Sequence, residues 1–291
     1  MKIAIHGRSF TTDTQPYIQA LFDILKGRQI EYAISSSFYA FLLSAGVNPY
    51  TEKSYPHPHG APDADFMFSI GGDGTLLESV MQSRSRQIPI LGINTGRLGF
   101  LATVSPAMIA DSLEALFQGN FQTEDRTLVS LLSDTDLFED YNFALNDFTI
   151  TKTDTSSMIT VHAYLDGEFL NSYWADGLIV STPTGSTGYS LSCGGPVVLP
   201  TNDVFVITPI SPHNLNVRPM IIPDISRLSF RVESRSSNFL VSLDSRFRIV
   251  DSTVTLMVKK ELFKARLVKL SQDTFVQTLR TKLHWGLDAR N

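Results

Sequence analysis

One short segment combines the features of a phosphate-binding turn with a carboxylate. In "GGDGT", residues 71–75, glycines surround Asp73 after an apolar run and before a helix-like segment. Glycines let a ligand approach the backbone, and N–H groups at a helix N-terminus attract anions. Because Asp73 is itself an anion, we expect it to accept a proton or to bind magnesium; alternatively it only caps the following helix. Leu77 stands where a Rossmann fingerprint needs its third glycine, and the chain contains no P-loop Gly-Lys-Ser/Thr.

A second polar segment follows the next apolar run. In "GINTGRLGFL", residues 92–101, Asn94 and Gly96 suit a tight turn, and Arg97 carries a positive charge that phosphates attract. Both turns follow strands of one predicted parallel sheet, so they are expected at the same edge. Taken alone, an Asn-Thr-Gly turn is common.

Two adjacent polar residues, Asn146 and Asp147, interrupt the apolar run "ALNDFTI", residues 144–150. Neighbours in a strand point to opposite faces, so at least one of the two faces inward or into a cleft. A buried carboxylate needs partners. These are either ligand hydroxyls or backbone N–H groups at a bulge, and the sequence favours neither.

The longest unusual segment is "ADGLIVSTPTGSTGYSLSCGGPVV", residues 175–198, which is made largely of Ser, Thr, Gly and Pro after one apolar strand. It is not a Gly-x-Ser-x-Gly nucleophile turn, because Thr184 stands two places before Ser186. Core packing does not call for so many hydroxyls. We therefore expect them to face a polyhydroxylated or phosphorylated ligand, with Tyr189 stacking on or hydrogen bonding to a base or sugar.

The elements that position these segments divide the chain in two. Apolar strands at 2–7, 31–35, 65–70 and 88–94 alternate with helical patterns at 14–27, 38–46 and 105–119, which indicates a parallel sheet covered on both faces. After about residue 121, short Val-, Ile- and Thr-rich runs follow one another, and Asp166-Gly167 predicts a hairpin. The predicted fold is an N-terminal open parallel α/β domain (1–121), a C-terminal mostly antiparallel β domain (122–271), and a helical tail (272–291) that packs back on the first domain.

The bulk composition narrows the class of protein. The chain has 291 residues, a net charge of -5, no long basic run and one cysteine, Cys193, which argues against nucleic-acid binding and against disulfides. No apolar run approaches the ~20 residues that span a membrane, and "MKIAIHG" is too short for a signal peptide. We expect a cytoplasmic protein, and we interpret the loop "YPHPHG" (55–60) as surface rather than as a metal site.

Taken together, these segments resemble the NAD kinase family, which phosphorylates NAD to NADP. The resemblance depends on "GGDGT" (71–75), "NTGRLGFL" (94–101), "LND" (145–147), "DGLIVSTPTGSTGYSLSCGGP" (176–196) and "TPISPH" (208–213), in the family's order. "GGDGT" alone also fits diacylglycerol and sphingosine kinases, and phosphofructokinases have a related turn. The hydroxyl-rich segment followed by "SPH" is more specific.

The resemblance implies an active site in the cleft between the two domains, with NAD and ATP as substrates and Mg2+ or another divalent cation accompanying ATP. It implies that Asp73 is the general base on the 2′-hydroxyl of the adenosine ribose, and that small molecules are the partners of a homodimer or homotetramer. Asn146 and Asp147 would bind ribose or nicotinamide-side groups, Asp176 the nicotinamide end, and Asp244 would lie near the ligand. The remaining expected nucleotide-binding residues are Gly72, Gly74, Thr75, Asn94, Arg97, Phe100, Thr187, Gly188, Tyr189, Ser190, Leu191 and Ser192.

Three positions depart from the family pattern. The family usually has Asn-Glu at 146–147 and Ala at the positions of Gly188 and Cys193. None of these changes removes a catalytic group. Two other functions fit parts of the sequence: a lipid kinase, which would need an apolar membrane-binding surface, and a regulatory module that binds NAD or ATP without transferring phosphate.

Overall fold

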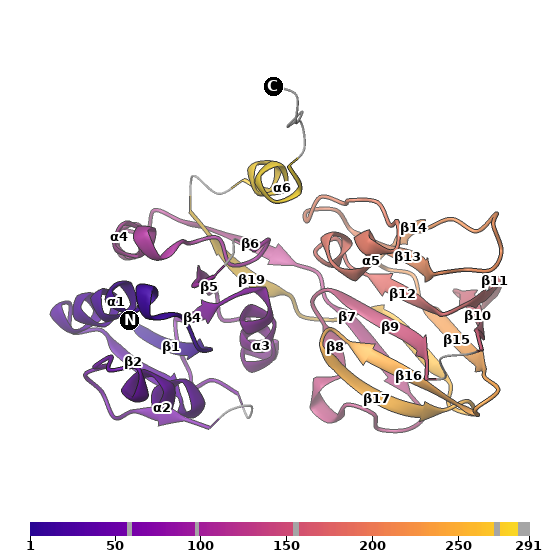
Figure 1. The fold of residues 1–291 in the computed structure, drawn as a ribbon, viewed down its shortest axis with the longest axis horizontal. Helices are drawn as coiled ribbons and strands as arrows, with labels where there is room; N and C mark the ends of the chain where they lie inside the picture. The colour runs from indigo at the N-terminus through magenta and orange to yellow at the C-terminus, as the bar shows by residue number, and fades with distance from the viewer. Residues whose placement is uncertain (57–59, 97–98, 154–156, 271–273, 285–291) are drawn as a thin grey trace. The chain divides into compact units, whose positions relative to one another are not determined.

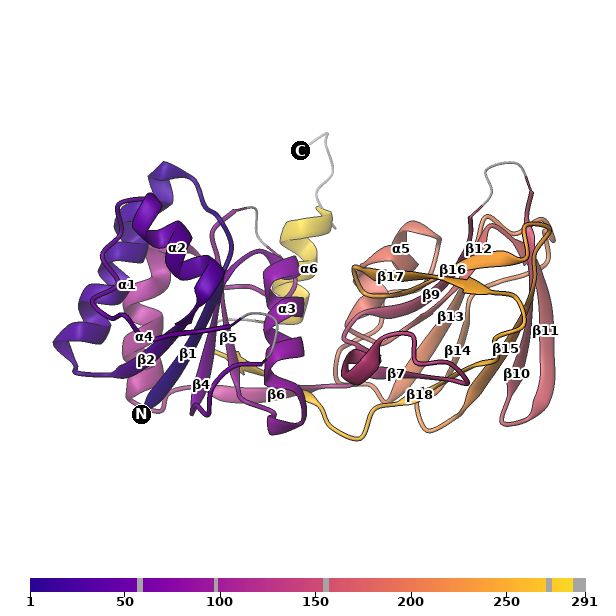
Figure 2. The ribbon, with the colours of Figure 1, turned by 90° about the horizontal axis from the view of Figure 1, so that it is seen from below.

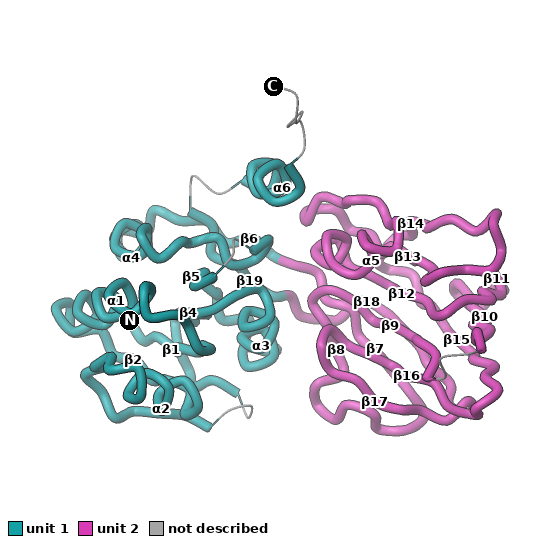
Figure 3. Tube along the Cα trace, viewed as in Figure 1, with its two compact units in different colours: residues 1–125, 265–291 teal, residues 126–264 magenta. Residues whose placement is uncertain are grey.

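The computed structural model describes residues 1–291 except 57–59, 97–98, 154–156, 271–273 and 285–291. The chain forms two compact units, residues 1–125 with 265–291 (unit 1) and residues 126–264 (unit 2), as Figure 3 shows. Among the helices of the described residues, none is both long and apolar enough to cross a membrane.

Unit 1 is built on a seven-stranded sheet in the order β3-β2-β1-β4-β5-β19-β6 (Figure 1). The ladders that join β3 through β5, and β5 to β19, are parallel. The strands are β1 (Lys2–Gly7), β2 (Glu31–Ser35), β3 (Ser54–Tyr55), β4 (Phe66–Gly71), β5 (Ile90–Asn94), β6 (Gln122–Arg126) and β19 (Ala265–Lys269).

Helices cover both faces of this sheet because its strands are apolar on both sides. Buried side chains of α1 and α4 pack on the face that carries Ile5 and Phe68, whereas Glu78 of α3 reaches His6 on the other face. Figure 2 shows α1 and α4 on the side opposite α3. The helices are α1 (Gln15–Gly27), α2 (Ser36–Ser44), α3 (Asp73–Ser83), α4 (Ile109–Phe117) and α6 (Phe275–Leu283).

Unit 2 consists of two six-stranded antiparallel sheets, ordered β11-β10-β15-β18-β7-β8 and β14-β13-β12-β9-β16-β17. Its strands are β7 (Val129–Ser133), β8 (Phe143–Ala144), β9 (Asp147–Lys152), β10 (Ile159–Leu165), β11 (Glu168–Ala175), β12 (Gly177–Ser181), β13 (Val204–Ile210), β14 (Met220–Pro223), β15 (Leu228–Glu233), β16 (Asn238–Leu243), β17 (Arg246–Asp251) and β18 (Leu256–Lys260), with the short helix α5 (Tyr189–Ser192).

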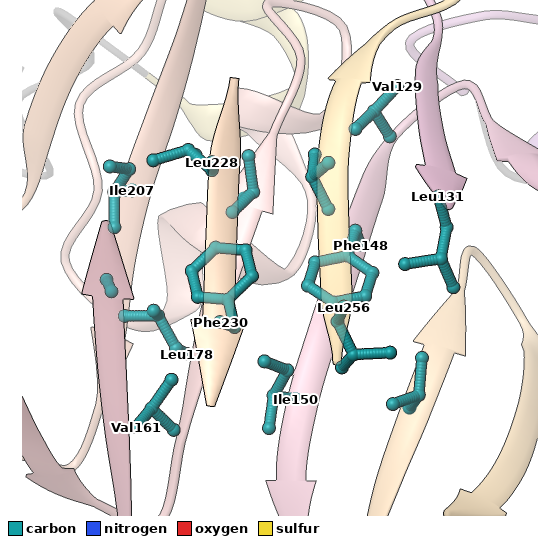
Figure 4. Close-up of a cluster of buried hydrophobic side chains, with 14 of the residues drawn as sticks. Val129, Leu131, Phe148, Ile150, Val161, Leu178, Ile207, Leu228, Phe230 and Leu256 are labelled. Atoms are coloured by element: carbon teal, nitrogen blue, oxygen red, sulfur yellow. The ribbon is translucent and has the colours of Figure 1, made fainter. Parts of the chain in front are cut away.

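A single apolar core joins the two sheets of unit 2 (Figure 4). Phe148 of β9 and Phe230 of β15 come from different sheets, and their rings stack with centroids 5.7 Å apart. Both rings are fully buried. Alternating strands such as β10 and β15, which point every second residue inward, supply the rest of this core.

The predicted fold class, a parallel α/β domain and an antiparallel β domain, is confirmed. The hairpin at Asp166-Gly167 is also present, with positive φ at both residues, joining β10 to β11. The division differs from the predicted boundaries, because β19 at 265–269 lies beside β5 in the sheet of unit 1 rather than in the β domain. The predicted surface loop at 55–60 falls largely outside the described residues.

Candidate active site

The turn between β4 and α3 has one side packed and one side open. Gly71 adopts φ +156°, and a Cβ on it would lie 2.2 Å from Oγ1 of the buried Thr75, so only glycine fits there. A Cβ on Gly72 or Gly74 would meet nothing within 4 Å. The backbone of these two glycines is therefore accessible to a ligand, as the sequence predicted for a phosphate.

The Asp73 carboxylate accepts three backbone hydrogen bonds from the segment that follows β5. The N–H of Phe100 donates to Oδ2 (2.8 Å), and those of Leu101 and Ala102 donate to Oδ1 (both 3.1 Å). Gly72, not Asp73, is the N-cap of α3, and no side chain caps that end. The alternative that Asp73 only caps its helix is therefore wrong.

Gly99 makes this arrangement possible. A Cβ on Gly99 would lie 1.8 Å from Oδ1 of Asp73, a distance that no side chain can occupy. The carboxylate thus packs directly against the Gly99 backbone. A carboxylate offers about four acceptor positions, so three N–H donors leave one for a substrate hydroxyl.

The other residues expected in unit 1 have defined places. Asn94, which is buried, shapes the turn: its Nδ2 donates to the Ala102 carbonyl (3.2 Å) and its Oδ1 accepts from Gly96 N–H (2.7 Å). The Phe100 ring contacts Phe275 of α6, with centroids 6.3 Å apart. Arg97 lies outside the described residues.

In unit 2, the Asp244 carboxylate makes a similar set of contacts. It accepts the N–H groups of Leu145 (3.0 Å), Asn146 (2.8 Å) and Asp147 (3.3 Å), while its own N–H donates to the Asp147 carbonyl (3.0 Å). Asp244 has φ +52°, a conformation that Asp tolerates better than most residues. The adjacent polar pair predicted from sequence, Asn146 and Asp147, is thus fixed through its backbone by the carboxylate of Asp244.

The side chain of Asp147 is buried beside this carboxylate. Only 7% of Asp147 is exposed, and Thr149 Oγ1 donates to its Oδ1 (3.1 Å). Burial, and next the negative charge of Asp244, raise the pKa of Asp147 to about 7. Burial likewise raises the pKa of Asp244, although its backbone N–H donors and Arg246 oppose that shift. The pair is therefore able to carry a proton near neutral pH.

Several hydroxyls of the segment 175–198 bond within the protein. Thr182 Oγ1 donates to the Leu145 carbonyl (2.5 Å), Ser186 Oγ donates to the Pro183 carbonyl (2.7 Å), and Ser190 Oγ lies 2.8 Å from Thr208 Oγ1. The inference that core packing does not call for these hydroxyls was wrong for these buried side chains. Of the residues in this segment that were expected to bind the nucleotide, Gly188, Tyr189 and Ser192 are exposed, and Thr187 and Leu191 are partly buried.

Two further contacts surround the predicted site in unit 2. Nζ of Lys152 lies 2.6 Å from Oδ1 of Asp176, so this predicted ligand residue is already paired with a cation. The ring of His213, in the "SPH" segment, packs on Trp174 with centroids 4.1 Å apart. In the part of the chain that the structure describes, no three His, Cys, Asp or Glu side chains gather as a metal site.

The sequence did not predict the glycines that let two backbone segments, or a backbone and a carboxylate, come into contact. Gly99 and Gly185 lie within the motifs but were not predicted as site residues, although a Cβ on Gly185 would lie 2.0 Å from the Asn146 carbonyl oxygen. Thr182 and Lys152, which bind Leu145 and Asp176, were missed as well. The available signal was a glycine in each polar motif, but the residue that each glycine approaches, Asp73 for Gly99 and Asn146 for Gly185, is distant in sequence.

Comparison with known proteins gives one family for both halves of the chain. Residues 21–121 match the ATP-NAD kinase N-terminal domain, and residues 145–270 match the ATP-NAD kinase C-terminal domain. The chain is 55% identical to the NAD kinase of Cytophaga hutchinsonii over 292 residues, covering 100% of both chains. It is 46% identical to that of Flavobacterium psychrophilum and 40% identical to that of Bacteroides fragilis, again over 100% of both chains.

Solved structures agree with this assignment. A yeast NADH kinase in complex with NADH superimposes with a TM-score of 0.86 at 22% identity, covering 99% of this chain and 89% of that one, and so shows the same fold. An NAD kinase from Archaeoglobus fulgidus in complex with ATP gives a TM-score of 0.73 at 25% identity, covering 98% of each chain.

Proposed function

The chain belongs to the NAD kinase family and is an NAD+ kinase that uses ATP, and within this reaction we propose that Asp73 is the general base. The 2′-hydroxyl of the adenosine ribose of NAD is the acceptor, and a divalent cation, Mg2+, accompanies ATP. The observation that supports this proposal is the Asp73 carboxylate, fixed by three N–H groups at a turn whose glycine backbone is open. The family assignment sets aside the lipid kinase and the regulatory module.

The proposed step moves one proton and one phosphoryl group. Asp73 accepts the proton of the 2′-hydroxyl as the new O–Pγ bond forms, while the bond between Pγ and the β,γ-bridging oxygen breaks and ADP leaves. Phosphoryl transfer depends mostly on positioning and electrostatics, so a base contributes only part of the acceleration, about 10²–10⁴-fold.

The residues present fit a magnesium ion that is bound mainly by the substrate. Mg2+ usually takes one or two carboxylates together with substrate phosphates, rather than an all-protein cage. Because the one remaining acceptor position of Asp73 is assigned to the 2′-hydroxyl, the ligands of the ion would come from the substrate phosphates and water. When bound, the ion offsets negative charge on the phosphates. The N–H groups of Gly72 and Gly74 would supply the protein's own donors, whereas the Thr75 N–H already donates to the Gly72 carbonyl (3.0 Å).

For NAD itself, we propose that unit 2 supplies the recognition. Asn146 and Asp147 would bind the ribose or nicotinamide-side hydroxyls, and Asp176 would bind the nicotinamide end in company with Lys152. Thr187, Gly188, Tyr189, Leu191 and Ser192, which are exposed or partly buried, would contact the dinucleotide, while Ser190 and Asp244 would support them through Thr208 and the 145–147 backbone. A homodimer or homotetramer, as the resemblance implies, and a cytoplasmic location are part of the same proposal.

The test is a coupled assay of the wild type and Asp73→Asn with NAD, ATP and magnesium. An NADP-specific dehydrogenase, which accepts the 2′-phosphorylated dinucleotide and not NAD, reports the product. Removal of the cation with EDTA, followed by excess MgCl2, tests whether the reaction needs a divalent cation. We expect Asp73→Asn to lose at least ~100-fold in kcat. A variant within a few-fold of the wild type would remove Asp73 from the proton transfer.

Because asparagine also presents an NH2 group to the three N–H donors, a second readout is needed. If Asp73 is the base, turnover of Asp73→Asn falls even where amide hydrogen exchange at residues 100–102 is as slow as in the wild type. If Asp73 only orders residues 100–102, the loss of turnover comes with faster exchange at these residues.

A further inference from the structure

The turn that we assign to phosphate contains no cation of its own. In residues 71–75 the only charged side chain is Asp73, and α3 carries no basic residue in its last turn or elsewhere in its sequence, "DGTLLESVMQS". P-loops place a lysine directly after the glycines. Besides Mg2+ and Arg97, which lies outside the described residues, a positive charge for the donor phosphates would have to come from another element of unit 1.

Arg8 stands at the carboxyl end of β1, next to this turn. Its N–H donates to the Ile70 carbonyl (3.0 Å), and the ladder pairs Gly7 with Ile70, so residue 8 lies beside the end of β4. In the strand order β3-β2-β1-β4-β5, the chain first adds strands on one side of β1 and then, with β4 and β5, on the other side. The switch point of this sheet therefore lies between β1 and β4. In open parallel sheets, ligands bind outside the carboxyl ends of the strands at such a switch point.

The Arg8 guanidinium is fixed rather than free. Its Nε donates to Oε2 of Glu78 (3.0 Å) and its Nη2 donates to Oε1 of the same carboxylate. Glu78 is in turn bonded to Nε2 of His6 (2.9 Å), which is 1% exposed and whose Nδ1 lies 2.9 Å from Ser35 Oγ. Glu78 is therefore held by the buried His6 on one side and by the exposed Arg8 on the other.

The two side chains of this ion pair differ in their exposure to solvent. The Arg8 side chain is 62% exposed and that of Glu78 is 23% exposed, so an approaching anion meets the guanidinium first. Burial alone would raise the pKa of Glu78, but hydrogen bonds from His6 and Arg8 lower it to about 2, so Glu78 stays ionised. Two of the five guanidinium N–H groups bind Glu78, and three remain.

Helix geometry places the pair near the open backbone of the turn. Glu78 follows Gly74 by four residues on α3, so both lie on one face of that helix. Gly74 is exposed and has open space where a Cβ would stand.

On these grounds we propose that Arg8, oriented by Glu78, binds the phosphates of the ATP donor at the carboxyl edge of the unit 1 sheet. The proposal deepens the function proposed above and depends on ATP being bound at this turn. Arginine suits the task because its planar fork can bind a carboxylate on one edge and phosphate oxygens on the other.

The chain offers a matched control. Arg28 also pairs with a glutamate, Glu114, and the two side chains are 44% and 47% exposed. Arg28 follows α1 and precedes β2, so it lies at the amino edge of the same sheet. An effect of surface charge alone would be the same for both arginines.

The experiment compares wild type, Arg8→Gln, Arg8→Lys and Arg28→Gln by calorimetric titration with ATP–Mg and with adenosine. For Arg8→Gln we expect the Kd for ATP to rise about 10-fold, the Kd for adenosine to stay within 2-fold, and the KM for NAD to change little. Arg8→Lys should recover part of the ATP affinity, and Arg28→Gln should match the wild type.

Three results would overturn the proposal: an unchanged Kd for ATP in Arg8→Gln, equal loss of ATP and adenosine binding, or the same loss in Arg28→Gln. Failure of the Asp73 mechanism is distinguishable, because it concerns turnover of the Asp73 variant, whereas Arg8 is tested by ATP binding with Asp73 intact.

Discussion

Each unit contains an aspartate that accepts three consecutive backbone N–H groups, yet the two carboxylates work in different surroundings. Asp73 binds residues 100–102 in unit 1, and Asp244 binds residues 145–147 in unit 2. Asp244 has a second carboxylate, Asp147, within its bonded segment; burial raises the pKa values of both, and the charge of Asp244 further raises that of Asp147. The same hydrogen-bonding pattern thus orients a single carboxylate in unit 1 and, in unit 2, assembles a pair in which Asp147 titrates near neutrality.

The comparison also shows how each arrangement depends on glycine. Gly99 allows the backbone to reach Asp73, and Gly185 allows the backbone to reach the Asn146 carbonyl. In both units, a polar motif is therefore positioned by a glycine from another loop, where any side chain would separate the two segments.

The largest expected effect on turnover in this comparison is that of Gly99→Ala on unit 1. Its Cβ would lie 1.8 Å from Asp73 Oδ1, so residues 99–102 must move and the carboxylate loses its fixed orientation. A displacement near 1 Å at a reacting group costs about 10²-fold, so we expect kcat to fall by that factor. Steady-state kinetics measure it, and amide hydrogen exchange at residues 100–102 should accelerate. Gly27→Ala, where a Cβ meets nothing within 4 Å, is the control.

If Gly99→Ala retained wild-type kcat together with faster exchange at residues 100–102, the bonds to Asp73 would be irrelevant to the reaction. The two units would then share a hydrogen-bonding pattern, but in unit 1 this pattern would have no role in the reaction.

An effect on stability is expected from Asp147→Asn in unit 2. The pKa of Asp147 is about 7 in the folded protein against an ordinary 3.8, so the folded state binds the extra proton between these values. The stability that this proton contributes is complete below pH 3.8 and is lost as pH rises through about 7. Asparagine mimics the protonated acid and can keep the Thr149 hydrogen bond.

A shift of about three pKa units corresponds to about 4 kcal/mol, so we expect Asp147→Asn to be more stable than the wild type by about 4 kcal/mol at pH 8 and by less than about 1 kcal/mol at pH 4. Urea unfolding at the two pH values measures the difference. An advantage that is the same at both pH values would show that Asp147 does not titrate near neutrality. The same variant should lose activity if Asp147 binds NAD.

Much of the fold was predictable because periodicity is a local property. Alternating residues in β10 and β15, and the stripe Ile18, Leu21, Phe22 and Leu25 in α1, determined their elements directly. The strand β6, "QTEDR", was not predicted, because it is polar and gains its place from the sheet rather than from its own pattern. For the same reason β19 was assigned to the wrong unit: its residues indicate a strand but not its neighbours.

The site was predictable in part for a related reason. Asp73, Asp147 and Asp244 stood out as carboxylates in segments with motifs, but the backbone N–H partners of Asp73 and Asp244 lie 27 to 99 residues away in sequence. Ser186 and Ser190 were expected to face a ligand, and only the structure shows their hydroxyls bonded inside the protein. The sequence identifies which residues are polar, but only the distances in the structure show whether a ligand or the protein itself forms hydrogen bonds with them.

The smallest expected effect would separate the two causes of the Asp147 shift. Burial and the charge of Asp244 both raise the pKa of Asp147, and Asp244→Asn removes only the second. Asparagine tolerates the φ of +52° at this position and can still accept the N–H of Asn146 through its side-chain oxygen. We expect the pKa of Asp147 to fall by about one unit, equivalent to about 1.4 kcal/mol. Carboxyl ¹³C NMR titration of the variant measures it, with Asp251→Asn, an exposed substitution elsewhere in unit 2, as the control. An unchanged pKa would mean that burial alone causes the shift, and the two carboxylates of unit 2 would then be neighbours without being an electrostatic pair.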